Sequence, residues 1–455
     1  MLDETSLHIL AGAKKKLDEG FAKLPAYEKQ VPGLAQLNEV VTAAANRLQD
    51  NYPYFHPLYA GQMLKPPHPV ARLVYALAMT LNPNNHALDG GRATSAMEKE
   101  AVAEIAAMFG WTNFLGHLCG GGTMANLEAL WVAGQLHPGK KILASEQAHY
   151  THQRISGVLK LPFESVRCDA RGRLDVDFLA ERAARGDVGT VVATMGTTAT
   201  GSVDPLAEIL ALKLEHGFRV HADAAYGGYF VLAANLEQDA QEAFSRMSEV
   251  DSIVLDPHKH GLQPYGCGCV LFGDPSVGRW YKHDSPYTYF SSKNLHLGEI
   301  SLECSRPGAA AAALWATQKL LPLERGREFA QGLARGRAAA MALYGKLHTD
   351  ARFEVAFAPQ LDIVIFLPTA ERASEASARS RHIFEAAAKR DLHLAVAELP
   401  LAFWENIGKM KRDRKTVSCL RSVLMKPEHL DWVDRIWERL VAATEASENR
   451  ALLRS

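Results

Sequence analysis

The chain has 455 residues, a formal net charge of −1, and 47% apolar against 22% charged residues. This balance gives no global field that would attract nucleic acid or an anionic membrane surface, so we expect neither as a partner. No run of 18 apolar residues is present, and the first five residues lack the pattern of a secretory signal, which predicts a cytoplasmic protein without a membrane span. The six cysteines are scattered, and Cys267-Gly268-Cys269 is too closely spaced for a usual zinc site, so we expect free thiols and no metal.

Residues 1–60 read as a helical lead-in that several prolines interrupt, and its last segment, Asn51 to Pro57, is too rich in proline for a strand or a helix. From about residue 98 to 275, helical patterns alternate with short apolar, β-branched runs. The expected helices are 98–109, 123–135 and 205–215, and the expected strands are 141–144, 165–168, 190–194, 218–223, 252–255 and 267–272. This alternation predicts an α/β fold with a mainly parallel sheet that carries helices on both faces.

Beyond Arg306-Pro307-Gly308 a long helical stretch is expected to reach about residue 348. Strand-like runs follow at 353–358, 362–367 and 416–424, which indicates a smaller α+β domain. We therefore expect three parts: the lead-in 1–60, a large domain 61–330 and a small C-terminal domain 331–455.

A glycine loop, Gly120-Gly121-Gly122-Thr123, opens one of the expected helices. Backbone amides at a helix start, together with the Thr123 hydroxyl, favour a bound phosphate. The spacing Gly120-x-Gly122-x-x-Ala125, with Glu146 about 20 residues on, also fits a dinucleotide fingerprint. Residues 114–118 contain no β-branched side chain to mark the strand that this fingerprint requires, and a flexible turn is the plainer alternative.

The segment from His221 to Gly228 places Asp223 at the carboxyl end of an expected strand, where open α/β sheets bind ligands. A buried carboxylate needs a cationic partner or hydrogen-bond donors, and a pyridinium nitrogen would satisfy it. An aspartate that caps the turn before the glycine pair is the alternative. We expect His221 itself to be structural.

Lys259 follows the apolar run Ser252 to Leu255, and an amine there can be desolvated, which lowers its pKa and lets it condense with a carbonyl. His149 and Thr198 follow two other expected strands and offer a planar ring and a hydroxyl. If the sheet is parallel, these groups, Asp223 and the glycine loop meet at one edge. A carboxylate and a lysine together are the minimum that pyridoxal phosphate chemistry requires.

These motifs resemble those of the group II pyridoxal-phosphate-dependent decarboxylases, which include the aromatic-amino-acid, tyrosine and glutamate decarboxylases. The resemblance covers nearly the whole chain, and the motifs around Asp223 and Lys259 are highly specific together. It implies the aspartate-aminotransferase type of fold (fold type I), an obligate homodimer with its active sites at the interface, and pyridoxal 5′-phosphate as cofactor. The chain departs from many relatives at Met124, where they carry glutamate.

The resemblance also implies residue roles: Lys259 bonds to the cofactor aldehyde, Asp223 binds the pyridine nitrogen, and His149 stacks on the ring. Ser305 would reach the phosphate in the other subunit. The implied cofactor-binding set is Gly122, Thr123, His149, Thr198, Asp223, Ala225, His258, Lys259 and Ser305. In the segment 284–292 we expect Tyr287, ahead of Tyr289, to be the proton donor, which completes a catalytic set of Lys259, His149, Asp223 and Tyr287. Tyr54, Phe55 and Arg421 are the expected substrate contacts, Arg421 through the substrate carboxylate.

The expected reaction is decarboxylation of an L-amino acid to the amine and carbon dioxide, and an aromatic, tyrosine-like substrate is favoured. An acidic substrate (glutamate or aspartate) and Cα–Cβ cleavage, as in the sphingosine-phosphate lyases, are the alternatives within this chemistry. A nicotinamide oxidoreductase, which depends on the glycine loop alone, and a non-catalytic cofactor-binding protein are the alternatives outside it.

Overall fold

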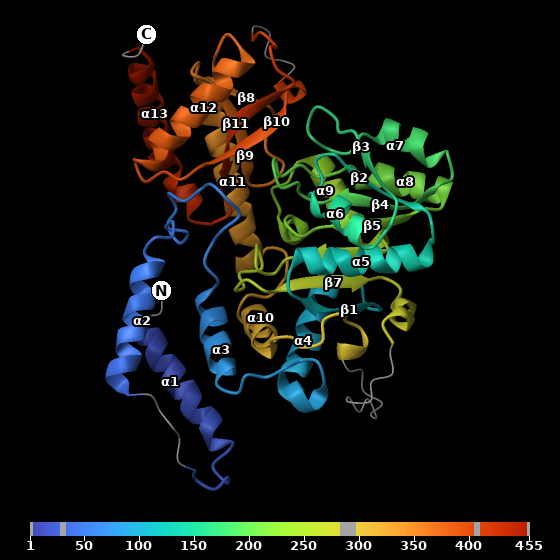
Figure 1. Ribbon diagram of the computed structural model, residues 1–455, viewed down its shortest axis with the longest axis vertical. Helices are drawn as coiled ribbons and strands as arrows, with labels where there is room; N and C mark the ends of the chain where they lie inside the picture. The colour runs from blue at the N-terminus through green and yellow to red at the C-terminus, as the bar shows by residue number, and fades with distance from the viewer. Residues whose placement is uncertain (1–2, 28–32, 283–296, 405–409, 453–455) are drawn as a thin grey trace.

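The computed structural model describes residues 3–27, 33–282, 297–404 and 410–452 (Figure 1). Its larger sheet has seven strands in the order β1-β7-β6-β5-β4-β2-β3. All neighbouring pairs are parallel except those of β7, which runs antiparallel to both β1 and β6. The strands are β1 (Leu115–Cys119), β2 (Lys141–Ser145), β3 (Phe163–Val166), β4 (Val188–Thr194), β5 (Arg219–Asp223), β6 (Ser252–Leu255) and β7 (Gly268–Phe272).

Helices cover both faces of this sheet, as the alternating pattern predicts. The helices of this part are α3 (Pro69–Met79), α4 (Leu88–Met108), α5 (Gly122–Leu136), α6 (Thr151–Val158), α7 (Val176–Ala183), α8 (Leu206–His216), α9 (Gln238–Ser245) and α10 (Gly308–Leu320). Helix α5 packs on one face, where its alanines meet inward residues such as Val254 and Val270. Helices α4, α7, α8 and α9 cover the other face, to which Ile253 and Leu255 point. The sheet is therefore buried on both sides, which is why its strands are almost continuously apolar.

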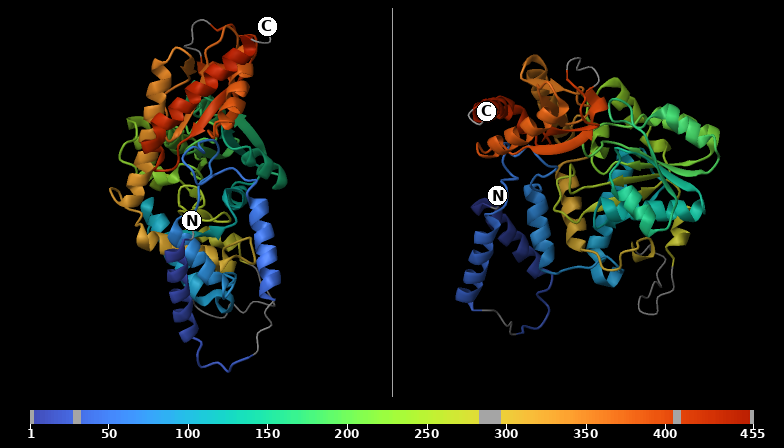
Figure 2. Two further views of the ribbon diagram at one scale, coloured as in Figure 1. Left: turned by 90° about the vertical axis from the view of Figure 1, so that its left-hand side faces the viewer. Right: turned by 45° about the horizontal axis from the view of Figure 1, so that its top comes forward.

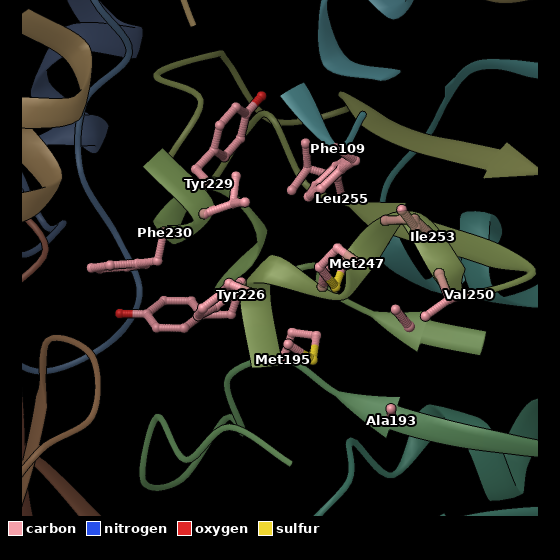
Figure 3. Close-up of a cluster of buried hydrophobic side chains, with 14 of the residues drawn as sticks. Phe109, Ala193, Met195, Tyr226, Tyr229, Phe230, Met247, Val250, Ile253 and Leu255 are labelled. Atoms are coloured by element: carbon pink, nitrogen blue, oxygen red, sulfur yellow. The ribbon is translucent and has the colours of Figure 1, made fainter. Parts of the chain in front are cut away.

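The chain that follows β5 is anchored in the apolar core beneath α4, α7, α8 and α9 (Figure 3). Tyr226, Tyr229 and Phe230 are buried there beside Met195, and the hydroxyl of Tyr226 donates a hydrogen bond of 2.5 Å to Asp362 Oδ1. Three buried aromatic rings immediately after Asp223 fix the backbone at the carboxyl end of β5.

The smaller sheet has four antiparallel strands in the order β10-β11-β9-β8. They are β8 (Phe353–Val355), β9 (Ile363–Pro368), β10 (Ala395–Pro400) and β11 (Thr416–Val423), with helices α11 (Glu328–Thr349), α12 (Ala373–Ala388) and α13 (His429–Leu452). Residues of all three helices pack with β9 and β11 in a second core cluster. The small α+β unit is thus as predicted, and the division of the chain at residues 60 and 330 stays a prediction.

The structure differs from the sequence-based expectations at residues 115–119 and in the long helix after Gly308. Residues 115–119 form β1 although none of them is β-branched, because pairing with β7 and burial of the strand outweigh its weak intrinsic preference. The glycine loop therefore does follow a strand. The long helix expected after Gly308 is two helices, since α10 ends at Leu320 before Pro322, and α11 begins only at Glu328.

Helix α1 (Glu4–Glu19) packs beside α3, whereas every residue of α2 (Leu34–Leu48) is exposed (Figures 1 and 2). Neither helix has a buried residue, although α2 carries Leu34, Leu37, Val41 and Leu48 along one face. No helix in the described ranges combines the length and the apolar character that a membrane span requires.

Candidate functional site

A cavity of about 540 Å³ opens at the carboxyl edge of the large sheet. Its described lining comes from the segments that follow five strands: the glycine loop after β1, His149 after β2, Thr198 after β4, Asp223 at the end of β5, and Lys259 after β6. Six of the seven strands run in one direction, so their carboxyl ends meet at this edge. The structure thus brings together the groups that the sequence predicts to meet.

The glycine loop wraps closely around a carboxylate at the start of α5. Gly121 has a φ of +146°, a conformation that L side chains rarely adopt. A Cβ on Gly122 would lie only 2.7 Å from Asp256 Oδ2, so a side chain does not fit there without moving Asp256. Gly122, Thr123 and Asn126 line the cavity from this helix, whose first amides have no partner within the helix. These amides and the Thr123 hydroxyl can hold a phosphate.

Asp223 is 5% exposed, and both of its carboxylate oxygens are engaged. Oδ2 lies 2.8 Å from Nε2 of His152, and Oδ1 accepts a hydrogen bond of 3.2 Å from the backbone N–H of Ala225. Burial alone raises the pKa of Asp223, but the hydrogen bond from His152, together with the charge of Lys259, holds that pKa below its usual value. Asp223 is therefore an anion at neutral pH and can hold a cationic ring nitrogen.

Lys259 is held by a carboxylate that belongs to the same turn. Its Nζ lies 2.9 Å from Oδ2 of Asp256, three residues earlier, and Asp256 is 3% exposed. Oδ1 of Asp256 is buried without a hydrogen-bond partner among the described residues. The amine is thus fixed at the cavity wall. Lys259 is the only lysine in the described lining of the cavity.

Two histidines flank this lysine from different segments. Nδ1 of His149 lies 2.8 Å from Thr151 Oγ1 and 3.4 Å from the Thr151 N–H, which makes Nδ1 an acceptor and places the proton on Nε2. Nδ1 of His258 donates to the carbonyl of Cys267 at 2.8 Å. Burial lowers the pKa of both histidines, so both are neutral planar rings at neutral pH.

Several predicted residues do not line this cavity. Ser305 is exposed and its hydroxyl accepts a hydrogen bond of 3.0 Å from Asn84. Phe55 lines other cavities, and Tyr54 packs edge-on against Tyr59 at 4.9 Å between ring centroids. Tyr287 and Tyr289 lie outside the described residues.

Arg421 lies behind the cavity wall rather than in it. This β11 residue is 4% exposed, and its guanidinium donates four hydrogen bonds within the protein. The acceptors are Thr198 O at 2.7 Å, Ala199 O and Gln62 Oε1 at 3.1 Å, and Gly61 O at 3.4 Å. In this arrangement Arg421 supports the Thr198 loop with four of its five N–H groups.

Three residues that surround the site were not expected from the sequence. His152 contacts Asp223, Asp256 contacts Lys259, and Glu303 lines the cavity and accepts a hydrogen bond of 2.9 Å from the Gly120 N–H. Two of them carried a local signal: His152 is one helical turn from His149, and Asp256 is one turn from Lys259. Glu303 is 183 residues from its partner, so nothing local could indicate it.

The cavity fits pyridoxal phosphate in its donor set. The anionic carboxylate suits the ring nitrogen of the cofactor, and the amine suits its aldehyde. The neutral planar histidine suits the aromatic face, and the amides at the helix start suit the phosphate. Two acidic side chains besides Asp223 line the cavity, Asp256 and Glu303, whereas no arginine does so within the described lining. We therefore expect this chain's own contacts to a phosphate to be amides, a hydroxyl and a histidine.

We expect the Gly122→Ala variant to bind pyridoxal phosphate about 5- to 150-fold more weakly, because the added methyl group must displace Asp256 and overpacking of this kind costs about 1–3 kcal/mol. The measurement is cofactor affinity by fluorescence titration of the apoprotein. Gly345→Ala in α11 is the matched control, since no atom lies within 4 Å of its added Cβ. Equal affinities of the two variants would show that the close approach has no role in binding.

The sequence profile of the pyridoxal-dependent decarboxylase conserved domain matches residues 127–368, more than half of the chain. A protein of Methanothermobacter thermautotrophicus named "Probable L-tyrosine/L-aspartate decarboxylase" is 29% identical over 312 residues, which cover 67% of this chain and 82% of that protein. The L-tyrosine decarboxylase of Enterococcus faecium is 28% identical over 387 residues and 63% of each chain is covered.

Solved structures share the fold across nearly the whole chain. Mouse CSAD superposes with a TM-score of 0.78 at 20% identity and covers 94% of this chain and 91% of its own. Oryza sativa TDC, solved with PLP and tryptamine, gives 0.75 at 18% identity and covers 97% of both chains. The predicted fold type I is thereby confirmed. With the profile match, the fold and the cavity in agreement, the chain belongs to the pyridoxal-dependent decarboxylase family.

Proposed function

We propose that this pyridoxal-phosphate-dependent decarboxylase acts on an L-amino acid with an uncharged aromatic side chain, tyrosine in the first place. The observation that carries the proposal is the cavity in which Lys259, Asp223 and the glycine loop meet. When bound, pyridoxal phosphate supplies an aldehyde that bonds to the substrate amine and a protonated ring that takes up the electrons of the breaking bond between Cα and the carboxylate.

The chain's own residues have three tasks in this proposal. Lys259 presents its amine to the aldehyde, and Asp256 holds that amine in place. Asp223 keeps a proton on the ring nitrogen because it stays ionised in a buried position. His149, fixed by Thr151, gives the ring a flat face to stack on. Thr198, Ala225 and His258 complete the described wall, and Ser305 and Tyr287 keep their proposed roles from the family resemblance.

The charge of the cavity supports an aromatic rather than an acidic substrate. Asp223, Asp256 and Glu303 face a single lysine in the described lining. A second carboxylate on the substrate would meet this negative wall, and like charges placed together cost several kcal/mol. The Enterococcus relative is named for tyrosine, and the Methanothermobacter relative for tyrosine and aspartate together, so aspartate is the second candidate.

The test is carbon dioxide release by purified protein with tyrosine, aspartate and glutamate, and with the amine product identified. We expect kcat/KM for tyrosine to exceed that for either acid by about 100-fold, the ratio that about 3 kcal/mol of charge repulsion gives. Lys259→Ala protein purified in parallel controls for contaminating enzymes. Faster turnover of aspartate would reverse the substrate assignment. Conversion of the β-hydroxy amino acid threonine to glycine and acetaldehyde, without carbon dioxide, would indicate Cα–Cβ cleavage.

We propose that the enzyme works as a homodimer in which the second copy covers α2. Leu34, Leu37, Val41 and Leu48 form an exposed apolar stripe on this helix, with no described partner in the same chain. Ser305 is exposed and is not among the described residues that line this chain's own cavity, which suits the proposed contact with the other site.

We expect the double change Leu37→Asp and Val41→Asp to shift the protein from dimer to monomer, because two charges replace apolar contacts at the proposed interface. Light scattering after gel filtration measures the mass. Asn46→Asp adds one charge on the opposite face of α2 and should leave the dimer intact. A stable wild-type monomer that turns over substrate at the full rate would contradict the dimer.

We also propose a cytoplasmic location. All six cysteines are free thiols, and four of them are buried, which suits a reducing compartment. Fractionation of the native cells with an antibody to the protein would test this.

A further inference from the structure

His152 is the second residue of α6 and makes a buried contact with the carboxylate of Asp223. The distance from His152 Nε2 to Asp223 Oδ2 is 2.8 Å, and the two side chains are 1% and 6% exposed. His149, three residues earlier, lines the cavity, whereas His152 does not. The start of α6 and the segment just before it thus place one histidine at the cavity and one against Asp223.

The contact with Asp223 is the only hydrogen bond that the His152 ring makes among the described residues. Its Nδ1 is buried with no partner there. A buried imidazole that leaves one nitrogen unsatisfied costs free energy, about 1–3 kcal/mol for such a group. An apolar side chain would avoid that cost, so packing alone does not account for a histidine at this position.

The two carboxylate oxygens of Asp223 have different hydrogen-bond partners. Oδ2 faces His152, while Oδ1 accepts one hydrogen bond, from the Ala225 N–H. A carboxylate oxygen can accept two hydrogen bonds, so each oxygen of Asp223 keeps one free lone pair. Asp223 lines the cavity, so its carboxylate can still accept a hydrogen bond from a ring nitrogen there.

The surrounding ionisable groups do not replace His152 in this contact. His221 is neutral, since burial lowers its pKa to about 3, and its ring is committed to Ser252 Oγ and Asn126 Oδ1, each at 2.8 Å. Lys259 is paired with Asp256. The described ionisable groups that act on Asp223 are His152 from α6, His149 just before that helix, His221 from β5, and Lys259 from the segment after β6.

We propose that His152 is a positioning residue: its N–H holds Asp223 ionised and oriented, so that the shared proton stays on the ring nitrogen of the cofactor rather than on Asp223. The inference rests on the role of Asp223 in the proposed function. Without the donor, the buried carboxylate becomes a stronger base, and it competes with the ring nitrogen for the proton. Histidine at position 152 thereby strengthens the ring as an electron acceptor without touching the cofactor.

The test compares two ligands that differ only at the ring nitrogen. Apoprotein is titrated with pyridoxal phosphate and with the analogue that has carbon in place of that nitrogen, for the wild type and for His152→Phe. We expect His152→Phe to weaken binding of pyridoxal phosphate by about 10- to 100-fold, the value of a hydrogen bond to a charged group. Binding of the carbon analogue should change less than about threefold.

Three further variants separate positioning from folding. His152→Asn has a shorter side chain that ends before the Nε2 position, so it should lose the same selectivity while it keeps a small polar group in the core. His152→Gln can place an amide N–H near that position and should recover binding of pyridoxal phosphate to within about fivefold of wild type. Ser156→Ala, one turn further along α6 at another buried side chain, should match wild type with both ligands.

The possible results distinguish failure of the His152 role from failure of the Asp223 role or of the proposed substrate class. If the His152 variants lose affinity for both ligands equally, or for neither, the positioning role is overturned while wild-type decarboxylation stands. If the wild type binds both ligands equally, the role of Asp223 falls and that of His152 with it. If wild type releases no carbon dioxide from any amino acid but shows the ligand selectivity, the proposed substrate class fails and the positioning role holds.

Discussion

Replacing Lys259 with alanine is expected to lower the rate of carbon dioxide release by at least about 10⁴-fold, as loss of a covalent nucleophile does in other enzymes. Lys259 is the only lysine in the described lining of the cavity, so no other amine of that lining can take its place, and Asp256 holds its Nζ at 2.9 Å. The measurement is single-turnover carbon dioxide release, which separates the chemical step from product release.

The matched control is Lys259→Arg, which keeps the positive charge beside Asp256 but lacks a nucleophilic amine. We expect it to be as inactive as the alanine variant while it retains more cofactor. Borohydride treatment of the wild type should fix the cofactor on the peptide that contains Lys259. A label on another lysine, or an arginine variant with near-normal turnover, would remove Lys259 from the proposed role.

Replacing Asp223 with alanine should lower kcat by about 10²- to 10⁴-fold, because removal of one member of a buried charge pair costs about 3–5 kcal/mol. Asp223 is buried and ionised, and it is the carboxylate that the proposal places against the ring nitrogen. We expect the loss to fall mainly on kcat, since a ring that is less able to accept electrons slows bond cleavage more than it weakens substrate binding.

Two variants make this expectation specific. Asp223→Asn keeps the shape and loses the charge, and it should be nearly as slow as the alanine variant if charge is what matters. Thr123→Ala removes one hydroxyl at the glycine loop and should cost less than about tenfold, the value of a single neutral hydrogen bond. An Asp223 variant that is as active as Thr123→Ala would contradict this ranking.

The large architecture and most of the cavity could be predicted from the order of residues along the chain. Apolar runs that alternate with amphipathic helices lead to a parallel sheet because both faces must be buried, and the carboxyl ends of such strands meet at one edge. Asp223, Lys259, His149 and Thr198 each follow such a run, so their meeting could be predicted from chain order alone. The glycine loop could also be predicted, because three consecutive glycines stand at the start of an expected helix. The structure gives the reason for two of them: at Gly121 the backbone conformation, and at Gly122 the space, allow no side chain.

The contacts that set the charge and hydrogen bonding of these residues could not be predicted, because they join segments that are far apart in the chain. Pairing with β7 made a strand of residues 115–119, whose own preference for a strand is weak. The contacts of His152 with Asp223 and of Glu303 with Gly120 join segments 71 and 183 residues apart. Hydrogen bonds of this kind depend on where helices and loops pack across the sheet. That packing results from many weak side-chain contacts between distant residues, which a local sequence pattern does not reveal.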